Sequence, residues 1–210
     1  MNKNIVLRLA QESEATEIND FYKLYFINVE PIQVAHKERF GLYDELKFYD
    51  DAIKKESVLV AVDSENEKIV GCLVAQKLNS CGTSNLPETG DIKANDILKL
   101  ITYIDEKSKI FEKFEVQSYL QIFTVCVHPD NKLQGIATKL FEACFALAKS
   151  QNFDLISVDC SSHFTTKIAE KLEMLLISSV TYDEYNKHLG KQLFTPVSPH
   201  TDIKTFAKLL

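Results

Sequence analysis

The chain has 210 residues, of which 45% are hydrophobic and 26% charged, proportions that are ordinary for one globular domain spanning residues 1–210. A net charge of −6 argues against a nucleic-acid partner, and the absence of a long apolar stretch or signal-peptide pattern argues against a membrane protein and a secreted one. Five cysteines without CxxC spacing argue against a metal or disulfide framework, so we expect a cytoplasmic, metal-free protein. We also expect the protein to be a monomer or weak dimer.

The first elements expected are a strand at residues 5–10 and a helix that Ser13 can cap. Apolar residues then recur at helical spacing from residue 18 to residue 29. Pro31 ends this helix, because the residue before a proline avoids the α region. Glu30 would therefore lie at a helix C-terminus, where the dipole and burial together raise the pKa of a carboxyl. The alternative is a solvated loop glutamate.

Acidic side chains are concentrated in the first third of the chain. Residues 12–67 hold 14 acidic and 6 basic side chains, a net charge of −8. Such a segment could attract a cationic ligand, or it could form a solvated acidic face.

The rest of the chain alternates hairpin and crossover patterns. We expect helices at 43–55, 91–114 (interrupted near Asp105), 136–149, 161–172 and from Asp202, and strands at 57–62, 68–78, 119–127, 155–159, 174–180 and 194–197. A polar loop is expected at 79–90. This order predicts an α/β (α+β-like) fold with a mixed central sheet of about seven strands flanked by helices.

The most informative stretch runs from residue 119 to residue 149. An apolar strand at 119–127 leads through turn residues at 128–131 into an amphipathic helix. This arrangement directs unpaired backbone N–H groups and the positive end of the helix dipole at whatever lies above the turn, and Gly135 allows a close approach. Phosphate is the occupant that this geometry favours. An ordinary strand–loop–helix crossover is the alternative.

Residues 132–137 (KLQGIA) fit the pattern Arg/Gln-x-x-Gly-x-Gly/Ala, with lysine at the first position. On this motif the chain resembles the GNAT acetyltransferase superfamily, which implies that acetyl-CoA is bound. The pantetheine arm would pair with the main chain of Val125 and Val127, and the pyrophosphate would rest on the amides from Gln134 to Thr138. The resemblance assigns the following residues to the cofactor: Thr124, Val125, Cys126, Val127, Lys132, Leu133, Gln134, Gly135, Ile136, Ala137 and Thr138.

Three further segments resemble the insect-type arylalkylamine N-acetyltransferases. They are residues 29–32 (VEPI), residues 160–172 (CSSHFTTKIAEKL) and residues 194–200 (FTPVSPH). With the first strand, this resemblance covers nearly the whole chain. It implies acetyl transfer to the primary amine of dopamine, octopamine, tyramine, serotonin or tryptamine. The vertebrate enzymes carry two histidines where this chain has Gln121 and Phe123, so a histidine relay is not expected.

The resemblance also implies roles for individual residues. Glu30 would be the general base, acting through water, and Phe26 and Phe123 would line the amine site with it. Ser161 and Thr165, which are expected to share one helix face, would pass a proton to the departing CoA thiolate. Threonine at 165 departs from the serine of the family. Ser161 could instead be only a helix cap, and Thr165 only a surface residue.

Other expectations concern the surroundings of the site. A main-chain N–H at 123–125 would bind the oxyanion, and Cys160 is expected to be core rather than a nucleophile. Aromatic residues could frame an arene pocket or belong to the core; these are Phe21, Tyr22, Tyr25, Phe26, Phe40 and Tyr43. Three alternatives stay open: a polyamine or agmatine acceptor, a longer acyl-CoA donor, or a CoA-binding regulatory module without catalysis.

Overall fold

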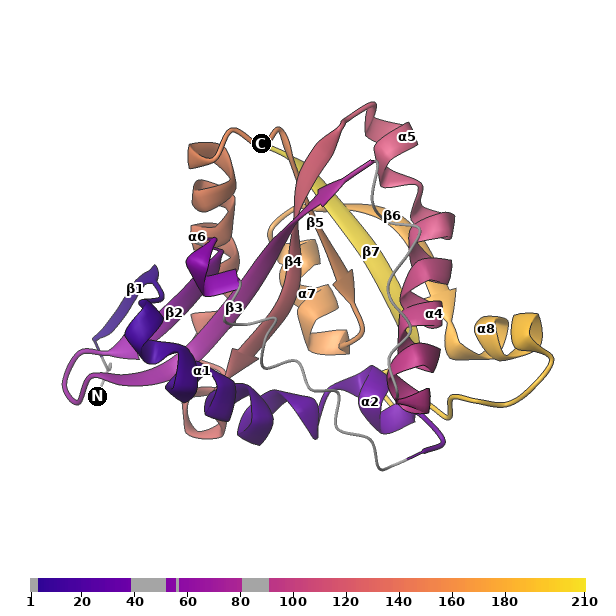
Figure 1. The fold of residues 1–210 in the computed structure, drawn as a ribbon, viewed down its shortest axis with the longest axis horizontal. Coiled ribbons are helices and arrows are strands. Elements are labelled where there is room, and N and C mark those ends of the chain that lie inside the picture. The colour runs from indigo at the N-terminus through magenta and orange to yellow at the C-terminus, as the bar shows by residue number, and fades with distance from the viewer. Residues whose placement is uncertain (1–3, 39–51, 56, 81–90) are drawn as a thin grey trace.

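The structure is a computed structural model that describes residues 4–38, 52–55, 57–80 and 91–210. In this part of the chain, seven strands form one mixed sheet (Figure 1). The strands are β1 (Ile5–Leu9), β2 (Val58–Asp63), β3 (Lys68–Asn79), β4 (Ser118–Val127), β5 (Leu155–Cys160), β6 (Leu175–Thr181) and β7 (Asp202–Leu209). Their order is β1-β2-β3-β4-β5-β7-β6, and among these neighbours only β4 and β5 run parallel. The predicted fold class is therefore confirmed.

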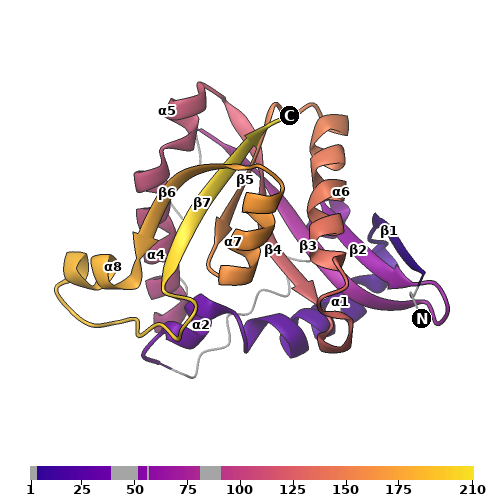
Figure 2. The ribbon, with the colours of Figure 1, turned by 180° about the vertical axis from the view of Figure 1, so that it is seen from behind.

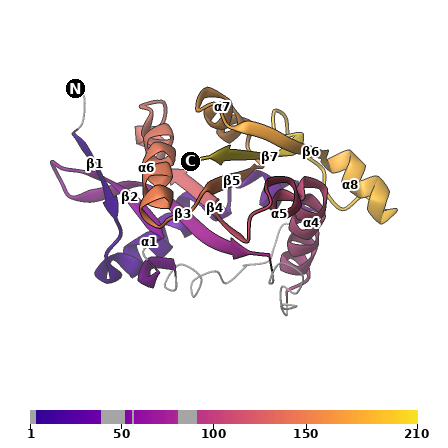
Figure 3. The same ribbon diagram turned by 90° about the horizontal axis from the view of Figure 1, so that it is seen from above.

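Helices cover both faces of the sheet. They are α1 (Ala15–Tyr22), α2 (Pro31–Ala35), α4 (Ile92–Ser108), α5 (Ile110–Phe114), α6 (Ile136–Ser150), α7 (His163–Lys171) and α8 (Tyr182–Leu189). Figure 2 shows α6 and α7 in front of the sheet, and both contribute to one core cluster with that face. Viewed from above, α1 and α4 lie on the opposite side (Figure 3), where each joins a separate buried cluster.

The largest cluster fixes α6 against the centre of the sheet. Leu140 and Phe141 of α6 are fully buried in this cluster, together with Leu73 of β3. Burying a side chain of this kind contributes about 1.5–3 kcal/mol. A Cβ added at Gly71 of β3 would lie only 3.0 Å from Cγ2 of Ile136, so glycine is what allows the start of α6 to approach the sheet.

The two parallel strands separate along their length. Pairing between β4 and β5 is confined to Leu120–Ile122 of β4 and Ile156–Val158 of β5. Beyond these residues the C-terminal ends of the strands diverge, as Figure 1 shows. The divergence opens the sheet at the point where the turn into α6 and the turn into α7 begin.

A bulge in β4 changes which side chains face α6. The register with β3 places Val74 opposite Thr124 and Ala75 opposite Ile122, so that the ladder steps over Phe123. Before the bulge, Ile122 packs in the core cluster that contains Leu140 and Phe141 of α6. After the bulge, Val125 packs against this cluster. An extra residue inverts the two-residue alternation of a strand, and here it turns Phe123 toward the opening.

Several expected boundaries differ from the observed ones. Asp202–Leu209 is a strand inserted between β5 and β6, not a helix. The predicted strand at 194–197 reduces to a single bridge between Phe194 and His36. The helical region after Asp91 breaks at Lys109, which adopts a left-handed conformation, rather than near Asp105.

The N-terminal helix also starts differently from the prediction. Ser13 lies inside a 3₁₀ turn, Glu12–Glu14, that precedes α1. The carboxylate of Glu14 accepts the N–H of Gln11 at 2.7 Å, so the expected Ser13 cap is wrong. Of the helix predicted at 43–55, residues 52–54 are helical and residues 43–51 lie outside the described part of the chain. Residues 81–90 of the predicted polar loop also lie outside the described part.

Candidate functional site

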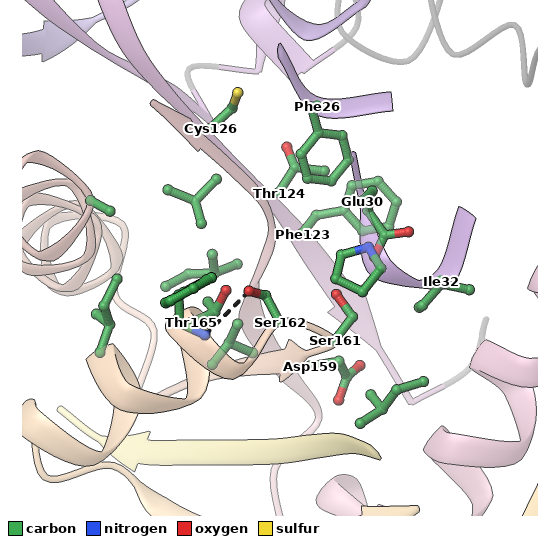
Figure 4. A pocket seen from close by; sticks show the side chains of 18 of the residues that line it. Phe26, Glu30, Ile32, Phe123, Thr124, Cys126, Asp159, Ser161, Ser162 and Thr165 are labelled. Atoms are coloured by element: carbon green, nitrogen blue, oxygen red, sulfur yellow. Dashed lines mark hydrogen bonds between the residues drawn. The ribbon is translucent and has the colours of Figure 1, made fainter. Parts of the chain in front are cut away.

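A cavity of about 1230 Å³ opens where β4 and β5 separate. Its walls come from the segment around α2, one face of α4, the second half of β4, and the first turns of α6 and α7 (Figure 4). The volume exceeds the range of roughly 300–1,000 Å³ that is usual for one small ligand. The cavity therefore has room for two reactants side by side.

Nearly all the site residues predicted from the sequence border this cavity. The lining includes Phe26, Glu30, Phe123, Thr124, Val125, Cys126, Val127, Lys132, Leu133, Gly135, Ile136, Ala137, Thr138, Ser161 and Thr165. Gln134 is not part of the lining, and its side-chain Nε2 donates to the carbonyl oxygen of Asp130 at 3.3 Å. The fold thus brings together residues from four distant segments of the chain.

One end of the cavity is the N-terminus of α6. This helix begins at Ile136 without a side-chain cap, after Gly135 with a φ of +77°. The first N–H groups of a helix have no partner within the helix and carry the positive end of its dipole. A Cβ added at Gly135 would meet no atom within 4 Å, so bare backbone borders open space there. This cradle, with Lys132 on the same wall, fits the pyrophosphate of acetyl-CoA.

Glu30 is the N-cap of α2. A π-helical turn, Lys23–Ile27, continues α1 to its end, and Pro31 occupies the first position of α2. The Oε2 atom of Glu30 accepts the N–H of Gln33 at 2.8 Å. Glu30 has the extended backbone expected before a proline (φ −65°, ψ 127°), but it begins α2 rather than ending the first helix, because a proline at the first helical position starts a helix.

Burial nevertheless raises the pKa of Glu30, in the direction expected from the sequence. The N–H of Gln33 and the hydroxyl of Ser161 oppose this shift because both stabilise the charged carboxylate. Glu30 keeps some exposure and borders the cavity (Figure 4). A carboxyl in this setting accepts a proton closer to neutral pH than a free glutamate does.

The start of α7 places hydroxyl groups on the opposite wall. Ser162 is the N-cap, since its Oγ accepts the N–H of Phe164 at 3.2 Å (Figure 4). Ser161 therefore precedes the helix, and the expectation that it caps the helix or shares a helix face with Thr165 is wrong. Both Ser161 and Thr165 still border the cavity, and the Ser161 hydroxyl is a hydrogen-bonding neighbour of the Glu30 carboxyl.

The aromatic residues divide between the cavity and the core. Tyr25 and Phe26 border the cavity, whereas Phe21 and Tyr22 are buried in the cluster under α1. Phe40 and Tyr43 lie outside the described residues. Cys160 is 1% exposed within the core, and burial raises the pKa of its thiol, which opposes formation of a nucleophilic thiolate.

The structure adds lining residues that the sequence analysis did not select. Asp159 of β5 accepts hydrogen bonds from Thr205 at 2.6 Å and from Gln121 at 3.0 Å. Asp105 of α4 and His200 also border the cavity. The position of Asp159 two residues before Ser161, near the end of β5, was a usable signal, because residues this close in sequence also lie close in space. The approach of Asp105 is set by the packing of α4 and has no local signal.

Two further observations concern the described residues as a whole. They contain no group of three or more histidine, cysteine, aspartate or glutamate side chains that could hold a metal ion. None of their helices is both long and apolar enough to cross a membrane.

Comparison with known proteins identifies the family. Residues 17–169 match the acetyltransferase (GNAT) family. The structure is similar to that of mosquito arylalkylamine N-acetyltransferase-like 5b, with a TM-score of 0.90 and 27% identity over 99% of this chain and 100% of that chain. The polyamine N-acetyltransferase of Drosophila melanogaster, which forms N-acetylagmatine, gives a TM-score of 0.88 and 22% identity over 99% and 100%.

Arylalkylamine N-acetyltransferase 2 from Aedes aegypti gives a TM-score of 0.87 and 21% identity over 98% of this chain and 99% of that chain. These three likenesses cover 98–99% of this chain. The predicted enzyme class, an acetyl-CoA-dependent N-acetyltransferase, is confirmed. The chain belongs to the acetyltransferase (GNAT) family.

Proposed function

We propose that residues 1–210 act as a single domain that transfers the acetyl group of acetyl-CoA to the primary amine of an arylalkylamine. The observation that carries this proposal is the position of Glu30. Its partly shielded carboxyl borders the same cavity as the α6 cradle and the second half of β4. A base and a binding site for the acetyl donor thus share one space that holds two ligands.

The free amine is the nucleophile, and it must first lose a proton. An alkylammonium has a pKa of about 10.4, so forming the free amine at pH 7 costs about 4.6 kcal/mol. Glu30 accepts this proton through a water molecule, and the burial that raises its pKa makes it a better base. Phe26 and Phe123, which line the cavity near Glu30 in Figure 4, exclude bulk water from the reacting amine.

Bound acetyl-CoA supplies the acetyl group as a thioester, so a C–N bond forms while the C–S bond breaks. The main chain at 123–125 donates to the developing oxyanion. The hydroxyl of Ser161, with Thr165 beside it on this wall, delivers a proton to the departing sulfur. After attack the nitrogen of the tetrahedral intermediate still carries two hydrogens, and it loses one of these protons to Glu30, which has released the first ammonium proton to solvent. Ser161 recovers a proton from Glu30, whose carboxyl its hydroxyl contacts, so this second amine proton finally resides on the CoA thiol.

Two observations support the arylalkylamine acceptor. The mosquito protein at 27% identity is named for that substrate class, and the aromatic wall of Tyr25, Phe26 and Phe123 suits an arene. A second candidate is a polyamine or agmatine. It is favoured by the Asp105 and Asp159 carboxyls on the cavity wall and by the likeness to the Drosophila enzyme.

The test is a panel of amines with acetyl-CoA and a free-thiol readout, using tryptamine, tyramine, spermidine and agmatine. We expect amine-dependent thiol release that Glu30→Gln lowers roughly 10²- to 10⁴-fold. Release with the two arylalkylamines supports the first candidate, and release with spermidine or agmatine alone supports the second. Tight CoA binding without thiol release for any amine would refute catalysis and favour a regulatory CoA-binding module.

A further inference from the structure

The cavity continues beyond Glu30 along the wall formed by α4. Ile97, Ile101 and Ile104 line it, and they follow one another at helical spacing toward Asp105. Asp159 lies on the facing strand β5, two residues before Ser161, and both residues line the cavity. An apolar passage thus connects the proposed base with a second polar end that the acetyl-transfer chemistry does not use.

Asp159 is held in one orientation by its neighbours. Its Oδ1 accepts from the hydroxyl of Thr205 at 2.6 Å, and its Oδ2 accepts from Nε2 of Gln121 at 3.0 Å. Gln121 is 7% exposed, and its own Oε1 accepts from Gln76 at 2.8 Å. This chain of donors ends on a carboxylate at the cavity wall, where one remaining lone pair on each oxygen is available to a ligand.

Asp105 faces the same end of the cavity from α4. No hydrogen bond to its carboxyl is found among the described residues, and no lysine, arginine or histidine among them forms an ion pair with Asp105 or Asp159. Burial and the neighbouring Asp159 raise the pKa of Asp105 to about 7. The charged forms of these two carboxyls repel each other, and no protein cation pairs with them among the described residues. A hydrogen-bond donor on a ligand would therefore stabilise them.

The spacing sets the length of that ligand. Asp159 is two residues before Ser161, whose hydroxyl is a neighbour of the Glu30 carboxyl, so the Cα atoms of Asp159 and Ser161 lie at most about 7 Å apart. Three bonds of an extended chain span about 3.8 Å. A molecule whose primary amine and second polar group are separated by about six bonds of an extended chain, or about seven bonds through a para-substituted ring, spans a distance of this order.

We propose that Asp105 and Asp159 form a subsite that binds a hydrogen-bond donor at the far end of the acceptor amine. The donor can be the phenolic hydroxyl of an arylalkylamine or the second cation of a diamine, since both give hydrogens to a carboxylate at this distance. The proposal rests on the proposed acetyl transfer and specifies which amines it selects. Amines that lack a distal donor leave the remaining lone pairs of Asp159 and the carboxyl of Asp105 without a ligand donor when water is displaced, and such a mismatch is strongly discriminating.

The experiment compares kcat/KM within two matched pairs, tyramine against phenethylamine and 1,5-diaminopentane against pentylamine. We expect the member with the distal donor to be preferred at least about tenfold in one pair or both. Preference in the first pair identifies a phenol as the source, and preference in the second identifies a cation. Equal kcat/KM within both pairs overturns the subsite while leaving acetyl transfer intact.

Three variants test whether Asp105 and Asp159 cause the preference for amines with a distal donor. In Asp159→Asn and Asp105→Asn, the kcat/KM of the amine that carries the distal donor should fall severalfold. The kcat/KM of the matched amine without that donor should change little. Glu106→Gln is the matched control, because Glu106 is the exposed neighbour of Asp105 outside the cavity lining. A preference that persists unchanged in both aspartate variants overturns the proposal. Failure of every amine to react with wild-type protein overturns both the subsite and the proposed function, a result distinct from equal reactivity.

Discussion

The hydroxyl of Thr124 on β4 donates to the hydroxyl of Tyr22 on α1 at 2.9 Å, across 102 positions of sequence. Tyr22 is fully buried and Thr124 is 5% exposed. This contact ties the helix that leads to Glu30 to the strand that borders the cofactor cradle. The acceptor and donor sides of the cavity are thereby fixed relative to each other.

We expect Thr124→Val and Tyr22→Phe each to lower the free energy of unfolding by about 1–3 kcal/mol, because each leaves a buried hydroxyl without this partner. The double variant should lose less than the sum of the two, by about 1 kcal/mol. Urea denaturation of the four proteins measures this coupling. Additive losses would show that the contact does not contribute to the stability.

Gly135→Ala should weaken acetyl-CoA binding with only a modest loss of stability. The backbone there has a φ of +77°, so alanine costs about 1–2 kcal/mol in strain, and its Cβ would project into the open cradle. Gly190→Ala is a matched control, since Gly190 has a φ of +66° and equally open surroundings at the end of α8. Calorimetric titration with CoA should show weaker binding for Gly135→Ala alone. Equal CoA affinities for the two variants would remove Gly135 from the cofactor site.

Substitution of Ser161 and of Ser162, the two serines before α7, should have different effects on stability and on kcat. Ser162→Ala removes the cap of α7 and should lower stability by about 1 kcal/mol with little change in kcat. Ser161→Ala should lower kcat without that loss of stability, because Ser161 lies outside the helix and borders the cavity. Thermal denaturation and the thiol assay measure both quantities. A kcat for Ser161→Ala that equals the wild-type value would contradict its role as a proton donor.

The stability of the folded chain should fall as the pH rises from about 4 to about 7. Asp105 has its pKa raised from 3.8 to about 7, so in this window the folded state holds a proton that the unfolded chain has released. The stability that this proton confers is lost as pH rises, and three pKa units correspond to at most about 4 kcal/mol. Asp105→Asn should flatten the dependence and be more stable than wild type at pH 8. An unchanged pH slope in urea denaturation would contradict the assignment.

Local sequence patterns were enough to predict the centre of the fold. The apolar run of β4, the turn after it and the stripe of α6 lie in one continuous stretch, and each element follows its own periodicity. The wall that we propose for the cofactor was predicted to lie at one site for the same reason, and nearly all of its residues line the cavity. Its residues are neighbours in sequence and share one strand–turn–helix unit.

Features that depend on distant pairing were not predictable. The segment IKTFAKL in β7 is rich in helix formers, but its place between β5 and β6 makes it a strand. Glu30 was assigned to the wrong kind of helix end, because Pro31 can follow one helix or begin another. Asp105 and Asp159 come from a helix and a strand whose meeting is decided by tertiary packing.

The most direct test of the account is the pH dependence of kcat/KM for the best amine, measured by thiol release in wild type and Glu30→Gln. The amide side chain of that variant keeps an oxygen that can accept the Gln33 N–H, so α2 should remain capped. Wild type should show an acidic limb with an apparent pKa above that of a free glutamate, because burial raises the pKa of Glu30. Glu30→Gln should lose this limb and fall roughly 10²- to 10⁴-fold at pH 7. Turnover near the wild-type value with the limb intact would contradict the assignment of Glu30 as the base.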